Sequence, residues 1–186
     1  MTTIFSWSAA SRFPKWTLPI LIAATLLASG CSESLSPEML AVRKRFLSDK
    51  LASGSSQLRE EPIMTIREQL KDGRRKDGET VLVRARINAG DLPPFAEGLA
   101  SMTLTDATGH DGDESHDPHE CPFCKRDILE MMAILEFCDG EGKVIPEDAR
   151  SLFDLREFDL VLVEGTVRTK EDGMLHIQAT RLQVIR

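Results

Sequence analysis

Asp159-Leu-Val-Leu-Val-Glu-Gly165 is the stretch of this 186-residue chain that decides the fold class. Val161 and Val163 are two residues apart, and Val167 continues the same spacing, so their side chains would share one face of a β-strand. Gly165 falls inside this pattern, where it predicts a bend in the strand. The stretch therefore predicts a long strand with one buried face.

The residues that follow predict a hairpin. Glu171-Asp-Gly173 has the composition of a tight turn between antiparallel strands. A last strand then begins at Leu175, and its inward positions continue to Ala179 before they shift to Leu182. A β-bulge, which inserts one extra residue, produces such a change of phase.

Similar alternation occurs upstream, and it predicts three more strands and a short helix. Val81-Leu-Val-Arg-Ala-Arg86 and Met102-Thr-Leu-Thr-Asp106 alternate with period two, as does the run of Ala133, Leu135 and Phe137. Residues 146–155 start with Pro and two acidic residues and carry apolar side chains at helical spacing. The order is three strands, one helix and two strands.

This order resembles the OB-fold, a small five-stranded Greek-key barrel with a helix between strands three and four. The resemblance covers residues 62–186, and it implies a mainly β fold. A different antiparallel barrel or a sandwich is the alternative. The segments that carry the likeness are Thr65-Ile66 leading to Asp77-Gly78, Val81 to Arg86, Met102 to Asp106 and Asp159 to Gly165.

The first thirty residues have the pattern of an export signal. Arg12 and Lys15 precede an apolar run from Leu18 to Ala28, which is short for a membrane-spanning helix. The run ends in Leu27-Ala28-Ser29-Gly30-Cys31, which resembles the lipobox of bacterial lipoproteins. The resemblance implies cleavage after Gly30, a lipid on Cys31 and, because Ser32 follows, attachment to the outer membrane facing the periplasm. An ordinary secretory signal or an uncleaved anchor is the alternative.

Removal of this signal leaves 156 residues, and the net charge changes from −7 to −9 because residues 1–30 hold two basic residues and no acidic one. Ser36-Pro37-Glu38 predicts the start of an N-terminal amphipathic helix. We therefore expect a signal peptide at 1–30, a lipidated tether with this helix at 31–61, and the barrel at 62–186.

One stretch concentrates the chain's metal-ligating residues: His116-Asp-Pro-His119-Glu-Cys121-Pro-Phe-Cys124. Two thiolates and two imidazoles suit the tetrahedral coordination of Zn²⁺. His116, His119, Cys121 and Cys124 would fill the whole shell, so the predicted site is structural rather than catalytic. It would order a polar loop at about residues 108–126, here called the cluster loop.

Two other interpretations of the cysteine pair remain open. Cys121 and Cys124 could form a plain disulfide. Cys-Pro-Phe-Cys followed by Lys125 and Arg126 also resembles a glutaredoxin active site, which implies thiol–disulfide chemistry but needs a βαβ unit around it. Cys138, at the far end of the strand that leaves the loop, would be too distant to join either site and is expected to be a separate thiol.

Composition and motifs limit the function. An acidic chain with six Phe residues after position 30 and no Tyr is a poor candidate for a nucleic-acid-binding OB module. The sequence contains no Ser-His-Asp arrangement, phosphate loop or dinucleotide motif, and a four-ligand zinc would leave no open position for water. We therefore expect a lipid-anchored binding or scaffold protein of the cell envelope, with an envelope protein or glycan as its partner, rather than an enzyme.

Overall fold

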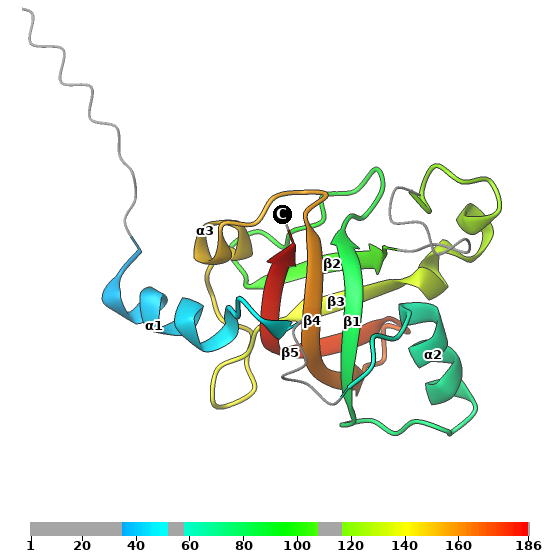
Figure 1. Ribbon diagram of the computed structural model, residues 1–186, viewed down its shortest axis with the longest axis horizontal. Coiled ribbons are helices and arrows are strands. Elements are labelled where there is room, and N and C mark those ends of the chain that lie inside the picture. Colours follow the sequence, from blue (N-terminus) through cyan, green and yellow to red (C-terminus); the bar gives the residue numbers. More distant parts are fainter. Residues whose placement is uncertain (1–34, 52–57, 108–116, 186) are drawn as a thin grey trace, which may run out of the picture. The chain divides into compact units, whose positions relative to one another are not determined.

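The computed structural model of the chain describes residues 35–51, 58–107 and 117–185. Its centre is a closed barrel of five strands in the order β1-β2-β3-β5-β4, shown in Figure 1. The predicted mainly β, OB-like barrel is confirmed. The strands are β1 (Thr80–Ile87), β2 (Ser101–Asp106), β3 (Met132–Glu136), β4 (Leu160–Thr169) and β5 (Leu175–Ile185).

Strand pairing makes the barrel a mixed sheet. All neighbouring strands are antiparallel except β3 and β5, which pair in parallel with Leu135 opposite Ile177. Four short helices accompany the strands in the described part of the chain: α1 (Pro37–Phe46), α2 (Ile63–Lys71), the 3₁₀ helix η2 (Cys124–Met131) and α3 (Ala149–Phe153). The helix expected between strands three and four is α3.

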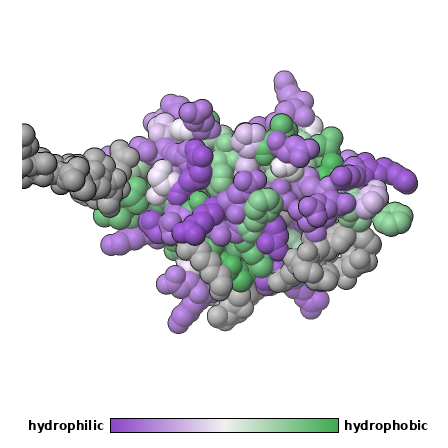
Figure 2. Space-filling view, turned by 90° about the horizontal axis from the view of Figure 1, so that it is seen from above, coloured by the Kyte–Doolittle hydropathy of each residue, from purple (hydrophilic) through white to green (hydrophobic). Residues whose placement is uncertain are grey.

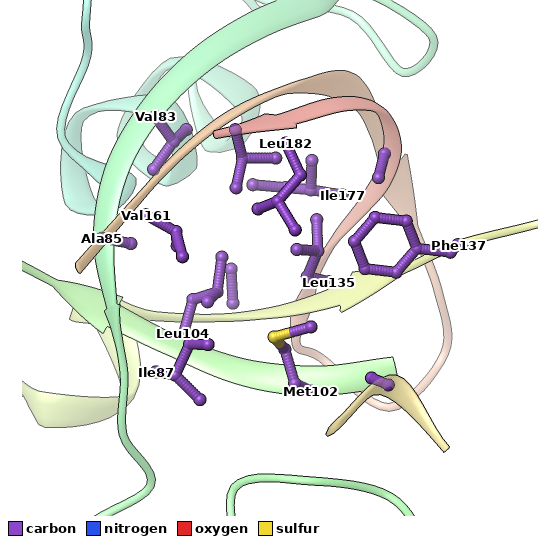
Figure 3. Close-up of a cluster of buried hydrophobic side chains, with 14 of the residues drawn as sticks. Val83, Ala85, Ile87, Met102, Leu104, Leu135, Phe137, Val161, Ile177 and Leu182 are labelled. Carbon is purple, nitrogen blue, oxygen red and sulfur yellow. The ribbon is translucent and has the colours of Figure 1, made fainter. Parts of the chain in front are cut away.

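The barrel interior is filled by the apolar residues that the period-two pattern predicted to point inward. Figure 3 shows side chains from all five strands pointing into one cluster. Burial of such side chains, at about 25 cal/mol per Å² of apolar surface, is the main contribution to the stability of a small barrel. The interior residues with no exposed surface include Val83, Ala85, Ile87, Leu104, Ala133, Leu135, Val161, Val163, Ile177 and Leu182.

The predicted bulge in the last hairpin is also confirmed. Glu164 lies opposite Arg181 and Gly165 opposite Ala179, so β5 carries one extra residue between these pairs. Gly165 is needed here because a Cβ would lie 2.6 Å from Ile177 Cγ2 and 2.7 Å from the Gln178 carbonyl oxygen. The absence of a side chain lets β4 and β5 approach at the bend.

α1 contributes directly to the core. Ser36 caps it by accepting a hydrogen bond of 3.2 Å from the Met39 backbone N–H, as the sequence predicts. Phe46, its last residue, is 1% exposed, and its ring centroid lies 5.1 Å from that of Phe137 and 6.2 Å from that of Phe153. The helix that we assigned to the 31–61 tether therefore packs on the barrel, beside α3 (Figure 1).

A carboxylate from the barrel caps α2. Asp106, the last residue of β2, accepts hydrogen bonds from the backbone N–H groups of Ile63 (2.7 Å) and Met64 (3.2 Å). Asp106 is 3% exposed, and this burial raises its pKa to about 6, although the two backbone donors act in the opposite direction. The start of α2 is thus fixed by a residue more than forty positions away.

The predicted signal peptide and Cys31 lie outside the described residues. Within the described ranges, no helix has the length and apolar character needed to cross a bilayer. The surface in Figure 2 is mostly hydrophilic, with several separate hydrophobic areas.

Candidate functional site at the cluster loop

The structure describes the second half of the cluster loop, from Asp117 onward. His116 lies outside the described residues, so its predicted role as a ligand stays a prediction. His119 and Cys121 are half-buried, and Cys124 is buried at the start of η2. The loop continues through η2 directly into β3, which fixes its second end to the barrel.

Asp117 organises the turn that carries these residues. Its side chain accepts a hydrogen bond of 2.9 Å from the His119 backbone N–H, and its carbonyl oxygen accepts from Glu120 and Cys121. The Cys121 carbonyl then accepts from the Lys125 backbone N–H at 3.0 Å, which closes the next turn around the Cys-x-x-Cys pair. An Asp before a Pro favours such a local turn.

A polar network joins this turn to the barrel. The amide group of Asn88, which is 1% exposed, donates to the Asp117 carboxylate at 3.3 Å, and its oxygen accepts from the Gly90 backbone N–H at 2.8 Å. The hydroxyl of Thr105, fully buried on β2, donates to the Asn88 carbonyl oxygen at 2.9 Å. His119 Nε2 lies 3.0 Å from the same hydroxyl.

These contacts indicate how the His119 ring bonds to Thr105. The Thr105 hydroxyl donates its one hydrogen to the backbone carbonyl oxygen of Asn88, so its oxygen is left to accept a hydrogen bond from His119 Nε2–H. Nδ1 is then the remaining nitrogen for a metal, and it faces Gly90 so closely that a Cβ there would lie 2.6 Å away. Gly90 has φ +65°, which also favours glycine. In this arrangement His119 attaches the cluster loop to the barrel.

The described residues do not assemble the predicted zinc shell. Among residues 35–51, 58–107 and 117–185, no group of three or more His, Cys, Asp or Glu side chains converges on a point that could hold a metal ion. Cys121 and Cys124 lie on one short turn, as a shared metal ion requires. For His119 to join them, its imidazole would have to turn away from Thr105 or bind through Nδ1.

The cysteines are thiols in this structure, with no disulfide among the described residues. The βαβ unit that a glutaredoxin site needs is not found in the described part of the chain, where a barrel surrounds the motif. Cys138 lies beyond the far end of β3 and is 5% exposed. Burial, followed by the charge of Glu136, raises the pKa of the Cys138 thiol, so little of it is ionised at neutral pH.

Beside the turn lies a cavity of about 620 Å³, here called the loop cavity. Part of its wall comes from the network above, and part from residues near the starts of β3 and β4. Its volume is in the range of small-molecule and peptide-anchor sites. The lining residues are Asn88, Ala89, Gly90, Asp91, Leu92, Asp117, His119, Glu120, Lys125, Ile128, Leu129, Met132 and Phe158.

The loop cavity combines apolar and acidic groups. Leu92, Leu129 and Phe158 leave 68%, 60% and 51% of their surface exposed. Phe158 has φ +67°, a left-handed conformation that is strained for an aromatic residue, and its backbone N–H donates to the Ile87 carbonyl at 2.8 Å. Three carboxylates and one lysine complete the charged part of the wall: Asp91, Asp117, Glu120 and Lys125.

Sequence reasoning missed this cavity and the network that supports it. Asn88 and Thr105 gave no signal by themselves, because a polar residue at the end of a strand is usually solvent-exposed. The Asp117-Pro118 pair is typical of a local turn, and the structure has a turn at this place, but the pair gave no sign that His119 would contact the barrel. Leu92 and Phe158 lie in connections that the strand pattern left unassigned.

No family model matches the chain, and no curated protein matches it. Among solved structures, it is similar to an aspartyl tRNA synthetase from Entamoeba histolytica, with 12% identity and a TM-score of 0.42 over 75% of this chain and 24% of that one. A protein from Leishmania major Friedlin described as an aspartyl-tRNA synthetase gives 12% identity and a TM-score of 0.40 over 79% and 25%. The chain spans about a quarter of the length of these two proteins.

Proposed function

We propose that the chain is a non-enzymatic binding protein of the cell envelope, attached to a membrane by a lipid on Cys31, whose partner docks at the loop cavity. The observation that carries this proposal is the group of exposed apolar side chains at the cavity, Leu92, Leu129 and Phe158, next to three carboxylates. Exposed apolar side chains grouped around a cavity are typical of interaction sites.

The lining favours a protein partner over a glycan. Apolar aliphatic side chains contribute much of the wall, and Phe158 is its one aromatic residue, whereas sugars are commonly bound by several aromatic faces and polar groups. The acids Asp91, Asp117 and Glu120 suit a segment that places Lys or Arg beside an apolar anchor. A segment with one apolar side chain flanked by basic residues is the expected ligand.

Site-specific photocrosslinking tests this function. A photoreactive phenylalanine analogue in place of Leu129 should capture one discrete partner in intact cells. Phe158→Gly should reduce that capture at least about fivefold, and glycine also suits the positive φ at this position, so the fold is expected to persist. Leu40→Gln on α1, where the leucine is 45% exposed, is the matched control and should leave the capture unchanged. Equal capture by wild type and Phe158→Gly would refute a site at the loop cavity.

Zinc is the second part of the proposal, with Cys121, Cys124, His116 and His119 as its ligands. The softness of the two thiols and their place on one turn support it. Purified protein should contain about one zinc per chain, and Cys121→Ser should lose it. His119→Ala separates two roles: loss of zinc supports His119 as a ligand, and full retention shows that it only attaches the loop to Thr105.

Lipid attachment has its own test. Cys31→Ser should move the chain from the membrane fraction to the soluble periplasmic fraction, because one lipid-bearing residue would provide the anchor. An unchanged membrane fraction would favour the uncleaved-anchor alternative. Mass spectrometry of the N-terminal peptide would identify a lipid on Cys31 directly.

A further inference from the structure

A second, smaller pocket of about 120 Å³ lies between α2 and the β4–β5 hairpin, which are neighbours in Figure 1. It shares no lining residue with the loop cavity. Four of its lining residues are cations and none is an acid: Arg67 and Lys71 from α2, and Arg168 and Lys170 from the hairpin. Leu70 and Met174 are among its apolar residues. We call it the basic pocket.

Arg67 is the buried member of this set. It is 9% exposed, its Nε donates to Glu130 at 3.1 Å, and its Nη2 donates to the Gly173 carbonyl oxygen at 3.0 Å. Its Nη1 is buried and has no hydrogen-bond acceptor among the described residues. A buried N–H group of a cation without an acceptor is costly, on the order of 1–3 kcal/mol, and an anion that drew the Arg67 guanidinium toward the pocket would supply an acceptor.

The carboxylates that contact these cations lie outside the pocket lining. Glu130 serves both Arg67 and Lys71, Asp77 lies 3.7 Å from Arg168, and Glu136 contacts Lys170 at 2.7 Å. Lys71 and Arg168 are 62% and 43% exposed, so both can turn toward a ligand.

From these observations we infer that the basic pocket binds the phosphate group of a small phosphate monoester. A tetrahedral oxyanion offers several acceptor oxygens, which suits the guanidinium and ammonium groups of these four residues. The pocket is well below the 300–1,000 Å³ of drug-sized sites, so it fits one anionic group and not an extended ligand. The apolar contacts of Leu70 and Met174 suit the organic part of the ester.

Isothermal titration calorimetry of the purified protein tests this inference, with inorganic phosphate and phenyl phosphate as probes. Sodium chloride at the same ionic strength corrects for general screening. We expect one site per chain, with phenyl phosphate binding more tightly than inorganic phosphate because of the apolar lining. A short-chain phosphatidate below its micelle concentration is the third probe, and tighter binding of that probe would identify a lipid headgroup as the source of the phosphate.

The double variant Lys71→Gln/Arg168→Gln changes two exposed side chains and should weaken binding about tenfold or more. Lys143→Gln, at a lysine that is 75% exposed and paired with Glu141 away from the pocket lining, should change it less than about twofold. Arg67→Gln should abolish binding. If this change of a buried residue unfolds the protein, the double variant still tests the pocket, because it alters only exposed side chains. Heats equal to those of chloride, or equal affinities of wild type and double variant, would overturn the inference.

Discussion

At the scale of single residues, the most informative side chains are buried polar groups that join segments far apart in the sequence. Thr105 connects β2 to the loop before residue 90 and to His119. Asp106, its neighbour, connects the same strand end to α2. One strand end thus positions both the cluster loop and the first helix of the barrel region.

Thr105→Val should lower the free energy of unfolding by roughly 1–3 kcal/mol. The substitution removes both hydrogen bonds of the hydroxyl, so the Asn88 backbone carbonyl and His119 Nε2 each lose a partner. Urea unfolding measures this loss. Thr103→Val, on the same strand but half-buried, should change it by less than about 0.5 kcal/mol. Similar losses in both variants would mean that the contact with His119 contributes nothing.

Asp106 predicts an unusual pH dependence. Its folded-state pKa of about 6 lies above the ordinary 3.8, so the folded chain holds this proton more tightly than the unfolded chain. The resulting stabilisation is complete below about pH 4 and is lost as the pH rises through 6, by roughly 3 kcal/mol in total. Asp106→Asn removes the titrating group.

The measurement is urea unfolding of wild type and Asp106→Asn between pH 4 and pH 7. The free energy of unfolding of the wild type, relative to that of the variant, should fall across this range. Other titrating groups are common to both proteins and cancel in the comparison. A constant difference would show that the two backbone donors from α2 keep the pKa of Asp106 near its ordinary value.

At the scale of elements, α1 differs most from its expected role. Its sequence predicts an amphipathic helix, and Leu40 on its outer side is indeed exposed. Its end, however, places Phe46 against Phe137 and Phe153, whose centroids are 4.3 Å apart. The helix therefore closes one end of the hydrophobic core together with α3.

Phe46→Ala should destabilise the barrel by about 3–5 kcal/mol, the usual cost of removing a buried aromatic ring that its neighbours cannot replace. Thermal and urea unfolding both report this change. Leu40→Ala on the same helix is the control and should alter stability by no more than about 0.5 kcal/mol. If the two variants behave alike, α1 is a tether and not part of the core.

At the scale of the whole molecule, features set by neighbouring residues could be predicted from the sequence, and features set by contacts between distant segments could not. The positions of the five strands along the chain, the hairpin at Gly173 and the bulge near Gly165 were predictable because each depends on local residue spacing and turn chemistry. Other features depend on contacts between distant segments, which local sequence patterns do not predict. These are the Asp106 cap, the Asn88–Thr105 network and the burial of Phe46. The cluster loop falls between these cases: its turn was predictable, and the engagement of His119 was not.

The buried position of Phe46 also predicts where the stable domain begins. A chain that begins at residue 62 keeps all five strands but lacks Phe46 and also Leu51, which is buried against Leu82 and Leu162. It should be markedly less stable than a chain that begins at residue 35, and its melting temperature should be lower by about 10 °C or more. Calorimetry of the two truncated chains checks this, and equal melting temperatures would place the domain boundary at residue 61.

The closed barrel also limits how a partner can be recognised. Every strand from β1 to β5 has a neighbour on both sides over at least part of its length, so no strand of the described barrel has a wholly unpaired edge. Strand addition to the described barrel would therefore compete with pairs that these strands already make. A peptide bound at the loop cavity, as we propose, would then be read mainly through its side chains, so single substitutions in that peptide should change affinity sharply.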